Sequence, residues 1–69
     1  MEPMFAERLR ILRREKGIRQ EQLAKSLGVT QRKTSYWETG QTEPDLHSIL
    51  KISEYFDITC DYLLGKTDY

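Results

Sequence analysis

Residues 20–40, QEQLAKSLGVTQRKTSYWETG, decide the fold of this 69-residue chain. They contain two helical segments, predicted over 20–27 and 30–39, and a glycine ends each of them. Gly28 can take the left-handed backbone that a sharp turn between helices requires. Ala24 is small enough for the second helix to pass close over the first. The stretch therefore predicts two crossed helices, with Ala24 and Gly28 as their hinge.

Helical periodicity continues on the N-terminal side of this unit. Phe5, Leu9, Leu12 and Lys16 follow one another at spacings of four, three and four residues, which places them on one face of a helix. Gly17 interrupts the pattern, so this first helix is predicted over 4–16.

Two more helices are predicted after Gly40. Asp45 caps a helix over 45–56, and Thr59 caps a short one over 60–64. The side chains expected on the buried face of the longer helix, with Ile52 beside them, are Leu46, Ile49, Leu50, Ser53 and Phe56. Since no segment reads as a strand, we expect a single all-α domain over 1–69, a compact five-helix orthogonal bundle.

The charge of the chain is zero overall but unevenly distributed. Residues 1–35 carry nine lysines and arginines against four acids, whereas residues 36–69 carry two against seven. One interpretation is a basic face for phosphates with an acidic back, and the other is an ordinary solvated helix surface. Composition alone does not choose between them.

Composition and spacing argue against several other classes of protein. No apolar run approaches the roughly 20 residues that cross a bilayer, and the N-terminus lacks a secretory signal. Cys60 has no partner for an internal disulfide, so we expect a cytoplasmic protein. We expect the Cys60 side chain to pack as a small hydrophobic residue rather than to act as a reactive thiol or an intermolecular crosslink. His47 has no ligand at metal-binding spacing. Without a catalytic triad, carboxylate dyad or phosphate loop, we expect no enzyme, no cofactor and no metal.

The stretch 20–40 resembles the XRE or lambda-repressor-like helix-turn-helix family, and the likeness extends from about residue 4 to residue 64. Downstream, PDL at 44–46 and DYLLG at 61–65 also look like the family pattern. Two positions depart from it. Arg19 stands where the family usually has a capping Ser, Thr or Asn, and Thr34 stands where Ile or Val normally fills the hinge. We expect the Thr34 hydroxyl to bond back to the carbonyl of Thr30.

Helical geometry predicts which side of the segment 30–39 faces a duplex. At about 100° per residue, Thr34, Trp37 and Glu38 point inward. The side chains expected to contact bases, in agreement with the resemblance, are Gln31, Arg32, Ser35 and Tyr36. The alternative for these residues is a plain solvated helix face.

Phosphate contacts form a second group of expected functions. Gln20 leads them because it lies at the amino end of a helix, where free N–H groups and the dipole favour an anion, and the resemblance implies a backbone-contacting Gln there. The other candidates are Arg19, Lys33, Thr39 and Gln41. For Arg19 and Lys33, loose surface charge is an equal alternative. The resemblance also implies a partly buried ion pair between Arg13 and Glu38.

These expectations combine into one functional hypothesis with a rival. We predict a sequence-specific transcriptional regulator that binds double-stranded DNA as a homodimer over a pseudo-palindromic operator. The proposed symmetric interface is the fifth helix and the tail, with Tyr62, Leu63 and Tyr69. The rival is a protein-interaction module, or an antitoxin-type partner binder, that uses the same bundle, because a fold does not dictate its function.

Overall fold

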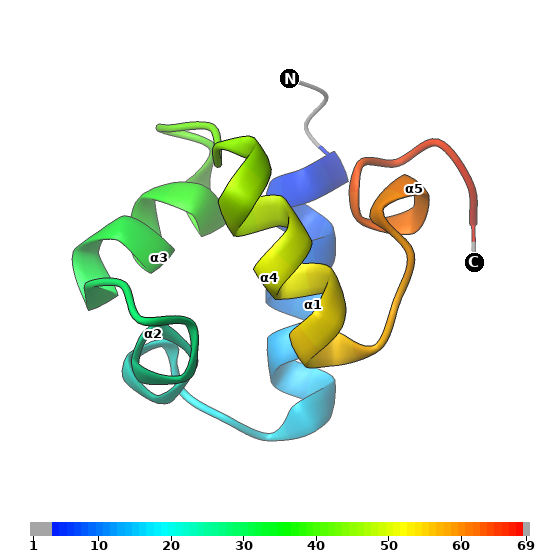
Figure 1. The fold of residues 1–69 in the computed structure, drawn as a ribbon. Helices are drawn as coiled ribbons and strands as arrows, with labels where there is room; N and C mark the ends of the chain where they lie inside the picture. The colour runs from blue at the N-terminus through cyan, green and yellow to red at the C-terminus, as the bar shows by residue number, and fades with distance from the viewer. Residues whose placement is uncertain (1–3, 69) are drawn as a thin grey trace.

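The computed structural model describes residues 4–68. Its helices are α1 (Met4–Lys16), α2 (Gln20–Leu27), α3 (Gln31–Thr39), α4 (Leu46–Phe56) and α5 (Cys60–Leu63). No strand occurs within residues 4–68, so the predicted all-α, five-helix fold is confirmed. Figure 1 shows the helices crossing one another around a common interior, with α3 and α5 at opposite sides of the bundle.

Capping side chains set where the helices begin. The Thr30 hydroxyl accepts a hydrogen bond from the backbone N–H of Lys33 at 3.1 Å, so Thr30 is the N-cap and α3 proper starts one residue later. Asp45 caps α4 in the same way, because its carboxylate accepts from the N–H of Ser48 at 2.8 Å. At the other end of the chain, α5 stops at Leu63, one residue before the predicted boundary.

The turn between α2 and α3 has the geometry that the sequence predicts. Gly28 adopts the left-handed conformation (φ 73°), and the N–H of Val29 bonds back to the carbonyl of Ala24 at 2.9 Å. Ala24 is buried. The ammonium of Lys51 in α4 donates to the carbonyl of Leu27, which ties the end of α2 to α4.

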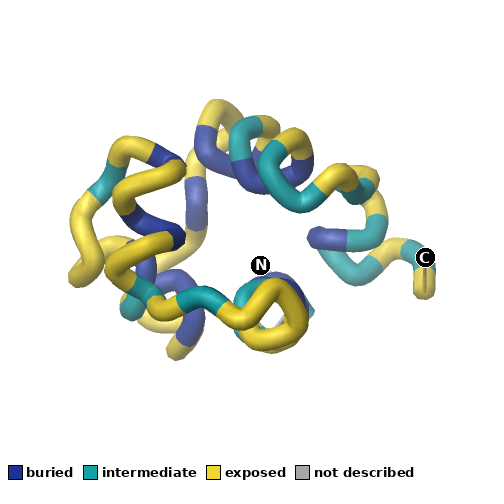
Figure 2. Tube along the Cα trace, turned by 90° about the horizontal axis from the view of Figure 1, so that it is seen from below, coloured by how far each residue is buried: buried dark blue, intermediate teal, exposed yellow. Residues whose placement is uncertain are grey.

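An apolar cluster holds the bundle together. Figure 2 shows the buried parts of the helices turned toward the interior and the exposed parts turned outward. The buried members of the cluster are Phe5, Leu9, Leu12, Leu23, Leu27, Trp37, Ile49, Ile52 and Leu63. Helix α3 packs on both α1 and α2. The core therefore fixes the orientation of α3 from two sides.

The predicted buried face of α4 is partly wrong. Leu46 is 72% exposed and Leu50 is 45% exposed, although both were expected in the core. Ile52, expected beside the stripe, is fully buried, and Ser48 is buried with it. The helix is thus rotated relative to the predicted stripe, and two leucines remain on its outer surface.

An arginine holds the C-terminal segment on the bundle. Arg8 of α1 is buried, and its guanidinium donates to the carbonyls of Tyr62 and Thr67. It also lies over the Tyr62 ring, 4.3 Å from its centroid, and 3.5 Å from the carboxylate of Asp68. The residues after α5 are therefore attached to the first helix.

Candidate nucleic-acid interface

The outer face of α3 carries polar side chains that are wholly or partly open to solvent. Gln31, Arg32 and Tyr36 are exposed, and Ser35 beside them is half-buried. On the opposite side of the same helix, three side chains point into the protein, as predicted: Thr34, Trp37 and Glu38. The helix therefore presents amide, guanidinium, hydroxyl and aromatic groups on one continuous surface.

The hydroxyl of Thr34 replaces the usual hydrocarbon in the hinge at small structural cost. It donates to the carbonyl of Thr30 at 3.4 Å, as expected, and the side chain is fully buried. The second unusual position, Arg19, leaves α2 without a side-chain cap. Instead, the side-chain oxygen of Gln22 accepts from the backbone N–H of Arg19 at 2.8 Å. One backbone N–H at the start of α2 is therefore bonded by a side chain of the helix itself.

A partly buried ion pair joins α3 to α1, as the resemblance implies. Arg13 Nε lies 2.7 Å from Glu38 Oε2, and Arg13 Nη2 donates to Glu38 Oε1 at 3.1 Å. Gln20 Nε2 also donates to Glu38 Oε1 at 3.1 Å, and Arg10 donates to the backbone carbonyl of Glu38. Three helices therefore meet at one carboxylate. The two-bond geometry of the pair is the strong form of a charge-assisted contact.

The candidate phosphate contacts lie on the surface around α3 and the start of α2. Arg19, Lys33, Thr39 and Gln41 are exposed, whereas Gln20 is half-buried because of its bond to Glu38. Gln41 Nε2 donates to the Thr39 hydroxyl at 3.0 Å, and this hydroxyl donates to the carbonyl of Ser35 at 3.1 Å. Thr39, the last residue of α3, and Gln41, just past its end, thus form one hydrogen-bonded unit.

The charge near the start of α4 is set by its cap. Hydrogen bonds from Ser48 hold the pKa of Asp45 below its usual value of 3.8, and the positive charge of Lys33 acts in the same direction. Asp45 is therefore ionised at neutral pH and engaged with the helix N-terminus. The negative charge of Asp45 therefore interacts with the backbone N–H groups at the start of α4.

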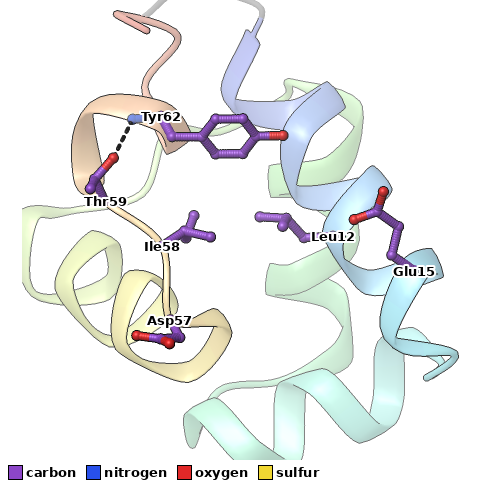
Figure 3. A pocket seen from close by; sticks show the side chains of 6 residues that line it. All are labelled: Leu12, Glu15, Asp57, Ile58, Thr59 and Tyr62. Carbon is purple, nitrogen blue, oxygen red and sulfur yellow. Dashed lines mark hydrogen bonds between the residues drawn. The ribbon is translucent and has the colours of Figure 1, made fainter. Parts of the chain in front are cut away.

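An open groove of about 540 Å³ lies between α1 and the α4–α5 connection. It is lined by Leu12, Glu15, Asp57, Ile58, Thr59 and Tyr62. Figure 3 shows Leu12 and Ile58 pointing toward one another with the Tyr62 ring above them, the Glu15 carboxylate on α1 and the Asp57 carboxylate at the end of α4. The floor of this groove is apolar and its edges are acidic.

The residues predicted for a dimer interface are not all available for one. Leu63 is 0% exposed and belongs to the core, so its assignment to an intermolecular surface is wrong. Its face of α5 packs against the bundle because a four-residue helix has one apolar side to bury. Tyr62 is half-buried at the groove, and Tyr69 lies outside the described residues.

Three basic residues with structural roles were missed in the sequence. Arg8 and Arg10 bind backbone carbonyls of the tail and of α3, and Lys51 binds the end of α2. Arg8 had a detectable signal, since it falls three residues after Phe5 and four before Leu12, on the predicted buried face. Nothing local marks the other two, because their carbonyl partners are 24 or more residues away along the chain.

Residues 4–68 hold no group of three or more side chains suited to a metal ion. Within the same residues, every helix is too short or too polar to span a bilayer. Cys60 is a free thiol, half-buried beside the core.

The crossed pair α2–α3, its glycine turn and the outward polar face of the second helix define a helix-turn-helix domain. The sequence profile of that family matches residues 9–63. The chain therefore belongs to the helix-turn-helix family, and the resemblance to its XRE or lambda-repressor-like members is confirmed.

Known proteins of this family resemble the chain over most of its length. It is 39% identical over 64 residues to YonR, an uncharacterized HTH-type transcriptional regulator of Bacillus subtilis, covering 93% of this chain and 59% of YonR. It is 43% identical over 61 residues to the transcriptional activator BcrR of Enterococcus faecalis, covering 88% of this chain and 30% of BcrR. The chain thus spans less than two thirds of either relative.

A solved structure supports the same assignment. The crystal structure of the P22 c2 repressor in complex with a synthetic operator superimposes with a TM-score of 0.87 at 36% identity. The match covers 93% of this chain and 97% of that one. The fold is therefore lambda-repressor-like.

Proposed function

We propose that the protein is a sequence-specific DNA-binding transcriptional regulator that inserts α3 into the major groove of an operator. The observation that carries the proposal is the outward face of α3, where Gln31 and Arg32 are exposed and Tyr36 is 37% exposed. Its buried face is fixed by the core and by the Arg13–Glu38 pair. A rigid helix with polar side chains outward matches the size and chemistry of a major groove. We expect it to act in the cytoplasm.

Each outward side chain of α3 has a distinct expected contact. Arg32 suits the O6 and N7 acceptors of guanine, and Gln31 suits the N6 and N7 edge of adenine. The Tyr36 ring suits a thymine methyl group, with its hydroxyl near a base or phosphate. Ser35 is less exposed than Gln31, Arg32 and Tyr36. Because its side chain is short, we expect it to add a smaller contact with the bases beside theirs.

The groups around α3 would fix the register of the domain on the duplex. Gln20 is placed at the amino end of α2, so its side chain and the free backbone N–H groups there suit a phosphate. The exposed candidates that would add further backbone contacts are Arg19, Lys33, Thr39 and Gln41. Such contacts bind all sequences about equally.

We infer that two copies bind a pseudo-palindromic operator, with their α3 helices about 34 to 36 Å apart in successive grooves. With Leu63 excluded, the surface that best suits a symmetric contact is the groove formed by Tyr62, Ile58 and Leu12. Sedimentation of the protein with and without operator tests this inference. A protein that stays strictly monomeric and still binds an operator tightly would refute it.

Selection of bound sequences from a random duplex pool tests DNA binding and supplies the operator. On that operator, Arg32→Ala is expected to relax preference at one base pair with about 1 to 3 kcal/mol lost there, whereas Gln20→Ala is expected to weaken all sequences about equally. Lys66→Ala is the matched control, because it removes one exposed positive charge just after α5, the helix that lies on the side of the bundle opposite α3 (Figure 1). Equal sequence-independent losses for Arg32 and Gln20 would defeat the division of roles.

The second candidate function is a protein-interaction module. The observation that favours it is the exposed pair Leu46 and Leu50 on the outer surface of α4. Salt distinguishes the two candidates. Binding through phosphates weakens steeply between about 50 and 200 mM salt, whereas an interface based on these leucines does not.

A further inference from the structure

The carboxylate of Glu38 connects the scaffold of the domain to a side chain on its candidate DNA surface. The side chain of Glu38 is 2% exposed, and Arg13 holds both of its oxygens. The remaining bond that reaches one of these oxygens comes from Gln20 Nε2, at 3.1 Å. Gln20 is at the same time the first residue of α2 and only half-buried.

We propose that Glu38 is a positioning residue for DNA binding, which orients the carboxamide of Gln20 before DNA arrives. This inference rests on the proposed function, because it concerns the phosphate contact that Gln20 would make.

The reason lies in which groups can donate a hydrogen bond. An ionised carboxylate only accepts, so the side chain of Gln20 must turn its NH₂ group, and not its oxygen, toward Glu38. A phosphate oxygen also only accepts. The NH₂ group has two protons, so one can remain on Glu38 while the other is offered to the phosphate. A Gln20 side chain turned the other way would present its oxygen to the carboxylate and to the phosphate, and both contacts would be repulsive.

Glu38 is suited to this role because it is buried and held by several hydrogen bonds. Arg13 grips the carboxylate through two nitrogens, and Arg10 binds the backbone carbonyl of the same residue. Fixing the donor in advance removes the loss of side-chain freedom that binding would otherwise incur. A free glutamine at the same place has no such constraint.

A double-mutant cycle on operator affinity tests the coupling. The dissociation constant is measured at one salt concentration for the full chain, Gln20→Ala, Glu38→Gln and the double variant, at a temperature where thermal melts show each to be folded. Gln20→Ala is expected to weaken binding roughly tenfold, the size of one hydrogen bond to a charged group. Glu38→Gln is expected to weaken it similarly in the wild-type background, but less than about twofold when Gln20 is already absent.

The outcomes separate this inference from the proposed function. If Glu38→Gln costs the same factor in both backgrounds, Glu38 acts only through the fold and the inference is overturned while DNA binding stands. If the wild-type chain selects no duplex at all, the proposed function fails and the inference fails with it.

A measurement on the unmodified protein keeps the inference testable if Glu38→Gln does not fold. Nitrogen relaxation of side-chain amides reports motion on the picosecond to nanosecond scale. In the absence of DNA, the Gln20 NH₂ group is expected to be nearly as rigid as the backbone, while that of the exposed Gln31 is mobile and becomes ordered only with operator. Equal mobility of the two groups in the free protein would overturn the proposed orientation.

Discussion

Replacing Thr34 by valine should stabilise the domain. The side chain is fully buried in the α2–α3 hinge, and its hydroxyl lies 3.4 Å from the carbonyl of Thr30. Hydroxyl bonds of normal strength are about 2.5 to 3.0 Å long, so this one contributes little. Removing it does not orphan the carbonyl, which still accepts from the backbone N–H of Thr34 at 3.2 Å. A buried methyl group in its place contributes about 1 kcal/mol, which is the expected gain.

Thermal and urea unfolding, followed by circular dichroism, measure this gain. For a domain of this length, 1 kcal/mol corresponds to an increase of about 4 to 8 °C in Tm. Thr39→Val is the matched control, since it makes the same change on the exposed side of α3, where the hydroxyl bonds to the Ser35 carbonyl at 3.1 Å. The control is expected to gain nothing and to stay within about 0.5 kcal/mol of wild type. A Thr34→Val variant less stable than wild type would show that the hydroxyl bond outweighs the methyl group, contrary to this reasoning.

Three further changes probe the ion pair, the helix cap and the tail. Arg13→Met leaves a buried carboxylate without its counter-ion and should cost about 3 kcal/mol or more in urea unfolding, a figure that a loss below 1 kcal/mol would contradict. Asp45 has a lowered pKa, so its cap stabilises the fold above the ordinary carboxyl pKa, and this contribution is lost as the pH falls through the folded value. Asp45→Asn should therefore lose less stability than wild type between about pH 5 and pH 2, and parallel pH profiles would count against the cap. Gly65→Ala places a methyl group 2.7 Å from Met4 Cβ at a backbone φ of 86°, so a lower Tm is expected. An unchanged Tm would show that the segment after α5 shifts to make room for the methyl group.

The features predictable from the sequence are those determined within a few residues. The left-handed turn at Gly28 and the caps Thr30 and Asp45 depend on local backbone chemistry, so their positions follow from residue type. The inward and outward faces of α3 can also be predicted from the sequence. The residues expected to point inward, Thr34, Trp37 and Glu38, all lie on one side of the helix.

The rotation of α4 could not be predicted in the same way. Its apolar residues extend over more than one face, so several choices of buried stripe fit the pattern. The structure buries Ser48, Ile49, Ile52 and Ser53, a face turned by roughly 70° from the predicted one at 100° per residue. The choice among faces depends on contacts with α2 and α5, which no local pattern reports.

The same limit applies to the candidate site. The resemblance placed Glu38 beside Arg13, but the bond from Gln20 joins residues 18 positions apart and depends on how α2 meets α3. The burial of Arg8 is a further case, because its carbonyl partners lie 54 and 59 residues along the chain. Its charged head finds acceptors that only the folded tail supplies.

The anchoring of the tail by Arg8 has a practical consequence for attachments to this domain. Because Arg8 binds the carbonyls of Tyr62 and Thr67, the backbone leaves the bundle in a fixed place next to α1. Figure 1 shows that place on the side away from α3. A fluorescent protein or an affinity tag joined there would lie on the side of the domain opposite α3. It would therefore not block the approach of α3 to a duplex.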